Sequence, residues 1–491
     1  MLHLRQKLAI QFLSSNFATV TNFIVSIVLA RLLSPSEIGI FSITAVVVNF
    51  SHVFRDFGVA AFIKRQKHLT PDMLRAALGV LMTSSWIIAA TLFVASDFLA
   101  AYFRQPGVGD TMKVLAIGFF FIPFGAVSNA VLGRELQAGK AAIATGVSTV
   151  VYATSCITLA YLGFSYMSLA WGNLLNIIAS VTTYNLLRPK GLPWLPSLRG
   201  WRSVAHFGLG AMLSSALKAI DNAIPDLFLG KLSTAHNVGL FSRANSTVNI
   251  LNHVTGPTLN YVSLPYMAAV HHSGADLGAE VTRAIAYLTA IAWPILAVTA
   301  ALAPEVIETL YGSAWLECAP VIPLLCLACA VQITFSFLQP ALTGIGRPYW
   351  TALPLVLVVA AKIALGLALF DGSLVSFAYA VVIAEVASIP AYLYLAHKHI
   401  QTRPGQLMLP LVSSLTLTLA VSLAVAGIKA LLFDSVAAPF ERLVVAGAIV
   451  LPVWTVTLLL IRHPLRRELL LMLSTVSATL QVRKRSDSGS R

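Results

Sequence analysis

Stretches of about 20 mostly apolar residues recur from one end of the chain to the other, with short polar segments between them. In hydrocarbon every backbone N–H and C=O must be hydrogen-bonded within the protein, and a helix of this length meets that need while spanning a bilayer. The composition agrees, because 57% of the 491 residues are hydrophobic and 11% are charged. The sequence therefore predicts an all-α integral membrane protein and excludes a soluble domain.

Hydropathy predicts about fourteen transmembrane helices, and twelve is the alternative count. The first one follows Arg5 and Lys7 and lacks a clear small-residue cleavage site. We therefore expect it to be a retained helix and not a signal peptide. The expected spans are residues 10–33, 37–56, 77–96, 111–133, 141–163, 165–187, 204–229, 237–262, 283–303, 318–343, 350–370, 373–396, 407–432 and 440–461.

The basic residues are distributed according to a membrane topology. The net charge is +14. Between the expected spans, roughly 23 Lys and Arg fall on the side of the N-terminus and roughly 6 on the other side, which predicts that both termini are cytoplasmic. The clusters at 64–68 and 188–202 and the basic tail 482–491 are then orientation signals that also meet anionic lipid. We expect no nucleic-acid partner.

The residues that commonly bind metals do not form a convincing ligand set. Cys326 and Cys329 match the CxxC spacing, but they lie in an apolar segment without the strand context of a redox motif. We expect these two cysteines, and Cys156 and Cys318, to be small core residues. The histidines at 271–272 and at 397 and 399 have no further acidic or Cys ligands nearby. The sequence predicts no metal and no cofactor.

Two segments of the chain resemble each other. Residues 32–50 and 231–250 share matches at a constant offset of 200, namely Gly39, Phe41, Ser42 and Asn49 with Gly239, Phe241, Ser242 and Asn249. A second similarity links 129–135 with 340–347. We expect two parallel six-helix repeats around a central cavity, followed by two C-terminal helices; chance similarity in apolar sequence is the alternative. The expected domains are 1–190, 191–403, the two helices in 404–462, and a basic cytoplasmic tail 463–491.

Four segments, taken in order, resemble a known family. They are LARLLSPSEIGIFS (29–42), RDFGVAAFIKR (55–65), DLFLGKLSTAHNVGLFSRAN (226–245) and PEVIETLYGSAWLECAPVIPLLCLA (304–328). The chain resembles the polysaccharide transporter family, the Wzx-type flippases of the multidrug and oligosaccharidyl-lipid exporter superfamily. It departs from the family at Phe241, where Tyr is usual, and at Leu227, where a basic residue is frequent; these departures concern the substrate and not the fold.

The resemblance implies a function in a bacterial inner membrane. Such proteins carry a polyprenyl-diphosphate-linked oligosaccharide from the cytoplasmic to the outer leaflet for surface polysaccharide biosynthesis. Their partners are membrane lipids and, in addition, polysaccharide polymerase and export machinery. An unaided flip would take a diphosphate and many hydroxyl groups through hydrocarbon at a large cost. A hydrated, partly cationic cavity would remove that barrier.

The expected seventh span carries charged residues on one helical face. Lys218, Asn222 and Asp226 follow at i, i+4 and i+8, and Asp221 lies one turn from Lys218. One interpretation is a polar wall in which Lys218 attracts phosphate and Asp221 or Asp226 exchanges a cation or proton. The other is an ion pair of Lys218 with Asp221 that stabilises the lobe.

The expected eighth span carries three asparagines, Asn245, Asn249 and Asn252, at i, i+4 and i+7. By the repeat offset, Asn49 and His52 of the second span correspond to the last two. Asn16 begins a similar polar row in the first span. These amides either line the substrate path or form hydrogen bonds between membrane helices.

Further charged residues have two interpretations each. Arg243 is either a phosphate anchor or a structural partner of Asp226. Arg55, next to Asp56, either caps the cytoplasmic end of its span or meets an entering headgroup. Lys362 and Glu385 lie near mid-membrane in consecutive spans and form either a buried pair or an ion-coupling site.

Two other function classes remain open at this stage. One is a cation-coupled drug exporter of the same superfamily, which would need mainly acidic, aromatic-lined sites. The other is a membrane oligosaccharide polymerase or ligase, but the longest expected outer loops, 97–110 and 304–317, leave no room for a catalytic lid. We therefore expect a transporter and no catalytic residues.

Overall fold

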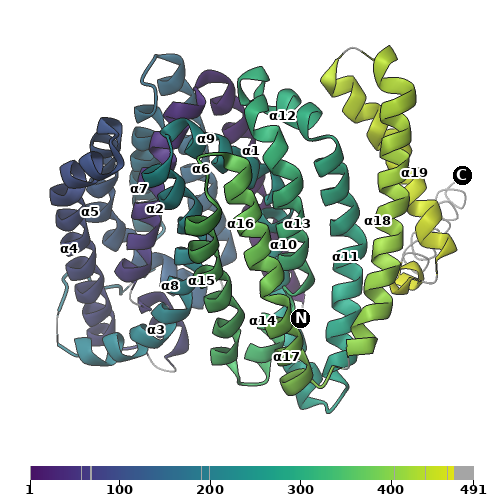
Figure 1. The fold of residues 1–491 in the computed structure, drawn as a ribbon. Coiled ribbons are helices and arrows are strands. Elements are labelled where there is room, and N and C mark those ends of the chain that lie inside the picture. Colours follow the sequence, from purple (N-terminus) through teal and green to yellow (C-terminus); the bar gives the residue numbers. More distant parts are fainter. Residues whose placement is uncertain are drawn as a thin grey trace, which may run out of the picture. The chain divides into compact units, whose positions relative to one another are not determined.

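The computed structural model describes residues 2–468 except 57, 67–68, 136, 190, 198, 403, 437 and 462. Of the basic residues expected to orient the chain, Lys67, His68, Lys190 and the tail 482–491 lie outside the described residues. The described residues form helices and no strand (Figure 1). This part of the fold prediction, an all-α chain, is confirmed.

The helices follow one another with short connections. In chain order they are α1 (Leu2–Leu32), α2 (Pro35–Asp56), α3 (Val59–Arg65), α4 (Pro71–Phe103), α5 (Pro106–Arg134), α6 (Ala138–Tyr161), α7 (Met167–Leu186), α8 (Trp201–Leu232), α9 (Ala235–Val248), α10 (Ile250–His272), α11 (Leu277–Ala301), α12 (Ala303–Tyr311), η1 (Ser313–Val321), α13 (Ile322–Thr334), α14 (Leu338–Gly344), η2 (Pro348–Thr351), α15 (Ala352–Leu369), α16 (Leu374–Ala387), α17 (Ile389–Ile400), α18 (Pro404–Leu432), η3 (Phe433–Ser435) and α19 (Pro439–Leu460).

The helices are long and apolar enough for a multi-span membrane protein. Within the described part of the chain, eleven helices or runs of helices have the length and hydropathy to cross a bilayer. Each segment expected to span the membrane coincides with a helix or with successive shorter helices. Several helices outside this set, among them α3, α9 and α12, have fewer than 18 residues, and in α8 Lys218, Asp221 and Asp226 interrupt the apolar sequence.

The chain groups into two compact units, which do not follow the sequence order. Unit 1 comprises Met1–Thr258, Leu310–Cys318 and Val358–Ala380. Unit 2 comprises Leu259–Thr309, Ala319–Leu357 and Val381–Arg491. The four domains expected from the sequence, with boundaries after 190, 403 and 462, stay a prediction.

In unit 1, α2 and α9 begin with similar side-chain caps. Ser34 precedes α2, and its backbone N–H donates to the Glu37 carboxylate at 2.7 Å while the Ser34 Oγ accepts from the Glu37 N–H at 3.4 Å. Thr234 precedes α9, and its Oγ1 accepts from the N–H of Asn237 at 3.2 Å. These caps satisfy N–H groups that have no partner inside the helix. The Ser and Thr positions of the two similar segments therefore set where each helix starts.

In unit 2, α11, α18 and α19 lie side by side (Figure 1). Thr289 of α11 and Ser414 of α18 share a buried hydrogen bond of 2.9 Å. Trp454 of α19 donates its indole N–H to the carbonyl of Ala290 at 2.9 Å. Buried polar contacts of this kind fix the rotation of helices that have no hydrophobic driving force between them in lipid.

The four cysteines are buried and form no disulfide with one another, so their prediction as core residues is confirmed. Cys156 of α6 shows how closely the helices of unit 1 pack. A Cβ added at Gly172 of α7 would lie 2.2 Å from the Cys156 Sγ. The absence of a side chain at this glycine lets the sulfur sit against the α7 backbone.

Candidate functional site

One charged residue of α8, Asp221, has an ion-pair partner on α15, within unit 1. Lys362 Nζ donates to Asp221 Oδ1 at 2.8 Å, and the two side chains are 5% and 16% exposed. Burial of two charges is compensated only when they are paired in good geometry. From the sequence, the expected partner of Asp221 was Lys218 or an exchanged cation, and the expected partner of Lys362 was Glu385. The structure shows an ion pair between Asp221 and Lys362. This ion pair joins two helices that are about 140 residues apart.

Glu385 lies on α16 in unit 2, where it is buried. Its Oε1 accepts a hydrogen bond from Gln332 Nε2 of α13 at 2.7 Å. A buried carboxylate in a membrane span is rare and usually functional, so Glu385 remains a candidate for ion coupling.

The other polar residues of α8 differ in exposure. Lys218 and Asn222 are exposed, whereas Asp226 is partly buried. The face predicted from the i, i+4, i+8 spacing therefore runs from an exposed amine to a half-buried carboxylate. At its buried end it comes within electrostatic reach of Arg243.

Arg243 of α9 is enclosed by polar groups of unit 1. Its Nη1 donates to the Oγ of Ser26 on α1, and Tyr152, Tyr311 and Asp226 are its electrostatic neighbours. Tyr311 is itself held by a 3.0 Å hydrogen bond with Thr247. The Arg243 Nε is buried and has no hydrogen-bond acceptor among the described residues. A guanidinium that is oriented by one hydrogen bond and has another N–H without an acceptor can donate to an anionic oxygen.

The three asparagines predicted on one face form a connected row at the junction of α9 and α10. Asn249 Nδ2 donates to Asn245 Oδ1 at 2.8 Å, and Asn252 Nδ2 donates to Asn249 Oδ1 at 3.0 Å. The helix predicted over 237–262 is interrupted at Asn249, which separates α9 from α10. The row thus lies where the helix is broken, and its amides orient one another along the chain.

The remaining predicted residues lie on α1 and α2. Asn49 is exposed, and Asn16 is partly buried. Arg55 Nε donates to Asp56 Oδ1 at 2.9 Å at the end of α2. The Arg55 carbonyl also accepts from Ser84 Oγ of α4 at 3.0 Å. The second of these contacts attaches the end of α2 to α4.

Residues that match at the offset of 200 meet where α2 crosses α9. A Cβ added at Gly39 would lie 1.7 Å from the carbonyl oxygen of Ala235, and one added at Gly239 would lie 1.9 Å from that of Pro35. Next to this crossing, Ser42 Oγ donates to Ser242 Oγ at 3.2 Å. The two helices therefore touch backbone to backbone, with similar residues on both sides.

Sequence analysis missed several partners of the site. Ser26 lies in the polar row that begins at Asn16 but was not expected to contact Arg243, and Tyr152 and Tyr311 were not among the predicted residues. The signal that could have identified the tyrosines is a hydroxyl-bearing aromatic in an apolar segment, which requires a polar neighbour when it is buried. Among the described residues, no group of three His, Cys, Asp or Glu side chains could hold a metal ion.

Comparison with known proteins places these features in a family. A family model described as "Polysaccharide biosynthesis protein" matches residues 28–320, more than half of the chain. The chain belongs to this family. Curated members similar to it include the "Succinoglycan biosynthesis transport protein ExoT" of Rhizobium meliloti (strain 1021), which is 24% identical over 91% of this chain and 91% of its own length. The "Lipopolysaccharide biosynthesis protein WzxC" of Escherichia coli (strain K12) is 20% identical over 61% of each chain.

This member of the polysaccharide biosynthesis family also shares a fold with a solved structure. "Lipid II flippase MurJ, inward closed conformation" superposes with a TM-score of 0.74, 11% sequence identity, and coverage of 93% of this chain and 99% of the other. The likeness shows the fold. The resemblance to Wzx-type polysaccharide transporters that the sequence indicated is confirmed.

Proposed function

We propose that the protein is a flippase that moves a polyprenyl-diphosphate-linked oligosaccharide across the bacterial inner membrane for surface polysaccharide biosynthesis. Membership of the polysaccharide biosynthesis family supports the substrate class, as does the description of ExoT as a transport protein of succinoglycan biosynthesis. The substrate carries a diphosphate, which needs cationic donors inside the membrane. In this proposal the protein transports and has no catalytic residues.

The observation that carries the proposal is the vacant Nε–H of Arg243. The guanidinium is held by its hydrogen bond to Ser26, so it is already oriented when a ligand arrives. A phosphate oxygen would complete its hydrogen bonding, whereas a cationic drug would be repelled. This favours a lipid diphosphate over the substrate of a cation-coupled drug exporter.

The proposed path continues through the polar residues of unit 1. Lys218 is exposed and can attract the diphosphate at longer range, while the row of Asn245, Asn249 and Asn252 offers amide donors to sugar hydroxyls. Asn49, Asn16 and Arg55 remain proposed path residues on α1 and α2. In this account the path is hydrated, which removes the cost of placing hydroxyl groups in hydrocarbon.

The proposed topology has fourteen spans, two parallel six-helix repeats and two cytoplasmic termini. The excess of Lys and Arg on the N-terminal side supports the orientation. The crossing of α2 and α9 supports the repeat, because Gly39 and Gly239 approach each other's helix at almost the same distance and Ser42 meets Ser242. A pseudo-two-fold axis near this crossing would let two lobes rock about it to alternate access.

The proposed coupling residues are carboxylates whose protonation changes the local charge. Protonation of Asp221 would release Lys362 from its ion pair, and Glu385 and Asp226 can take up a proton in partly or fully buried surroundings. A coupled ion can bias transport only if it stabilises one state of access more than the other. We therefore propose proton or sodium linkage at these residues; polymerase and export machinery remain predicted partners.

The proposal is tested by surface polysaccharide in cells that lack the native gene and express variants of Arg243. Arg243→Gln should reduce export at least about tenfold, because it removes a charge-assisted pair, and Arg243→Lys should restore it only in part. Lys398→Gln is the control, since Lys398 is an exposed cation that contacts Tyr394 and Trp350. Full export by Arg243→Gln at normal membrane abundance would contradict the proposed anchor.

A further inference from the structure

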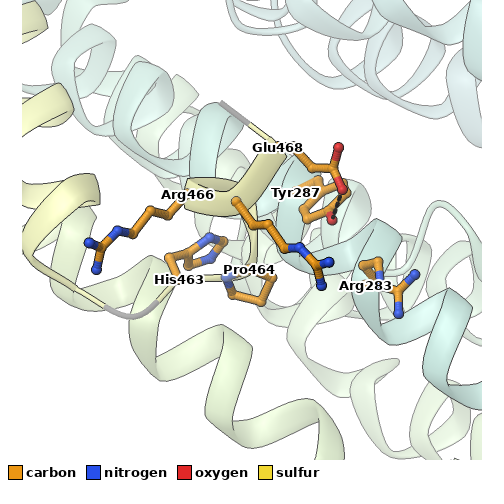
Figure 2. A pocket seen from close by; sticks show the side chains of 7 residues that line it. Arg283, Tyr287, His463, Pro464, Arg466 and Glu468 are labelled. Carbon is orange, nitrogen blue, oxygen red and sulfur yellow. Dashed lines mark hydrogen bonds between the residues drawn. The ribbon is translucent and has the colours of Figure 1, made fainter. Parts of the chain in front are cut away.

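A cavity of about 580 Å³ in unit 2 lies beside the first turns of α11. It is lined by Arg283 and Tyr287 of α11 and by the segment 463–468, which follows α19. Figure 2 shows Arg283 and Tyr287 on one side of the cavity, with His463, Pro464 and Glu468 of the segment facing them. Two arginines of the segment, Arg466 and Arg467, also line it. Arginines from both α11 and the segment therefore line one hollow.

The segment 463–468 is fixed to the helices behind the cavity by His463, which is 3% exposed. The N–H of Leu465 donates to His463 Nδ1 at 3.1 Å, so the neutral ring carries its hydrogen on Nε2. Nε2 lies 3.2 Å from Ser414 Oγ, and Ser414 bonds Thr289 of α11 at 2.9 Å. This buried chain of hydrogen bonds holds the wall of the cavity in place against α11 and α18.

The carboxylates near the cavity already have partners. Tyr287 donates its hydroxyl hydrogen to Glu468 Oε1 at 3.3 Å. Glu280 Oε1 pairs with Arg283 Nη1 at 3.0 Å, and its other oxygen accepts from Tyr266 at 2.8 Å. Among the described residues, Arg466 and Arg467 have no carboxylate within ion-pair distance. Within the described part of the chain, these two arginines therefore leave positive charge in the hollow without a carboxylate in ion-pair contact.

The cavity lies at the level where membrane helices end. Arg283 is in the second turn of the candidate span Leu277–Ala301, and the segment directly follows the candidate span Pro439–Leu460. Arginines at this depth meet lipid headgroups, and the planar guanidinium fork matches a phosphate. The helices that precede and flank the segment carry exposed apolar side chains, with Leu409 and Val412 on α18 and Leu460 on α19. Such side chains give acyl chains a surface next to the charged hollow.

We propose that this cavity binds the phosphate group of an anionic membrane phospholipid. Arg283 and Arg467 donate to the phosphate, and His463 positions the segment that carries Arg467. The bound lipid joins the start of α11 to the end of α19. This site is separate from the proposed path for the transported lipid-linked sugar, and export activity is not needed to detect it.

The test measures lipid retention by the purified full-length protein in detergent, by native mass spectrometry with phosphatidylglycerol, phosphatidylcholine or inorganic phosphate added. We expect one phosphatidylglycerol to be retained in preference to phosphatidylcholine. Arg283→Gln with Arg467→Gln should weaken this retention at least about tenfold, because two charge-assisted hydrogen bonds are lost. Lys398→Gln, which removes a cation near the end of α17, should leave retention unchanged.

Two further measurements keep the outcome interpretable. The double variant must keep the thermal midpoint of the wild-type protein in lipid-free detergent; if it does not, the single variant Arg467→Gln replaces it, with an expected loss of at least about threefold. Equal retention of phosphatidylglycerol by wild-type and variant would overturn the proposal. Retention of phosphatidylcholine by the wild-type protein that equals its retention of phosphatidylglycerol would also overturn it. A third contradicting result is binding of inorganic phosphate that is weakened by the same variant while no phospholipid is retained.

Discussion

Ser42 donates its hydroxyl hydrogen to the Oγ of Ser242 at 3.2 Å, and these two serines lie 200 residues apart in the sequence. One turn away, Gly39 and Gly239 each face a carbonyl of the opposite helix so closely that neither tolerates a Cβ. Small residues allow membrane helices to approach with their backbones in contact. In the proposed mechanism the two repeats rock about an axis near this crossing, so the contact between α2 and α9 must change when access changes.

A disulfide across this crossing should stop transport. In the double variant Ser42→Cys with Ser242→Cys, we expect an oxidant to form the bond, since the two Oγ atoms are adjacent. The bond would hold one state of access, so surface polysaccharide should fall to background and recover with a reductant. The single variant Ser42→Cys is the control, because the native cysteines are buried. Export that continues through the oxidised double variant would show that the crossing does not open.

The glycine contact should also be visible in stability. Gly39→Ala places a Cβ where the Ala235 carbonyl oxygen would be 1.7 Å away, so the helices must move apart. We expect the free energy of unfolding in micelles to fall by about 1 to 3 kcal/mol. Gly146→Ala is the matched control, because nothing lies within 4 Å of its Cβ position. A stable Gly39→Ala protein would mean that α2 and α9 are farther apart than described.

Much of the fold could be predicted because apolar length alone determines where helices form in a membrane. Gly39 and Ser42 were identified from the sequence because each has a match 200 residues later. The match does not indicate that the paired residues touch each other. The break at Asn249 was missed because hydropathy does not register a change of helix direction. At this break the Asn249 N–H still donates to the carbonyl of Asn245, so α9 keeps its last helical hydrogen bond.

The partners within the site were harder to predict than the site residues themselves. Asp221, Lys362 and Glu385 stand out in an apolar sequence, and the cost of burying a charge identifies them as important. Their pairing depends on which helices become neighbours. Consecutive spans suggested Lys362 with Glu385; the structure adds Asp221 as a partner of Lys362 and Gln332 as a donor to Glu385, and neither could be predicted from the spacing. Tertiary packing, which no short pattern encodes, makes that choice.

The Asp221–Lys362 pair gives opposite expectations for single and double substitutions. Lys362→Met alone leaves Asp221 buried without its partner and should lower the free energy of unfolding by about 3 to 5 kcal/mol. Lys362→Met with Asp221→Leu should restore most of that loss, because apolar replacement of a buried pair is tolerated. If Asp221 couples transport to an ion, the double variant should be abundant in the membrane but inactive in export. An active double variant would leave the pair with a structural role only.

Acidification should detach the segment 463–468. Burial lowers the pKa of His463 below its ordinary value of 6.5, because the charged ring would lose its contact with the Leu465 N–H and enter an apolar site. Docking is therefore at full strength above 6.5 and weakens as the pH falls from 6.5 towards the lowered pKa. Trypsin cleavage after Arg466 and Arg467 should become faster over this range. In His463→Gln the cleavage rate, expressed relative to that of an unstructured reference peptide at the same pH, should not change with pH; a pH dependence that persists in this ratio would assign it to another group.

The central claim is that the protein moves a polyprenyl-diphosphate-linked oligosaccharide and that Arg243 binds its diphosphate. The most direct test reconstitutes the purified protein in vesicles with a fluorescent polyprenyl-diphosphate oligosaccharide in both leaflets and follows its accessibility to an external reagent. The wild-type protein should make the inner-leaflet pool accessible, and Arg243→Gln should slow this at least about tenfold at equal protein content. Lys398→Gln should match the wild-type rate. An inner-leaflet pool that stays protected with the wild-type protein, under every imposed pH, sodium and voltage gradient, would contradict the account.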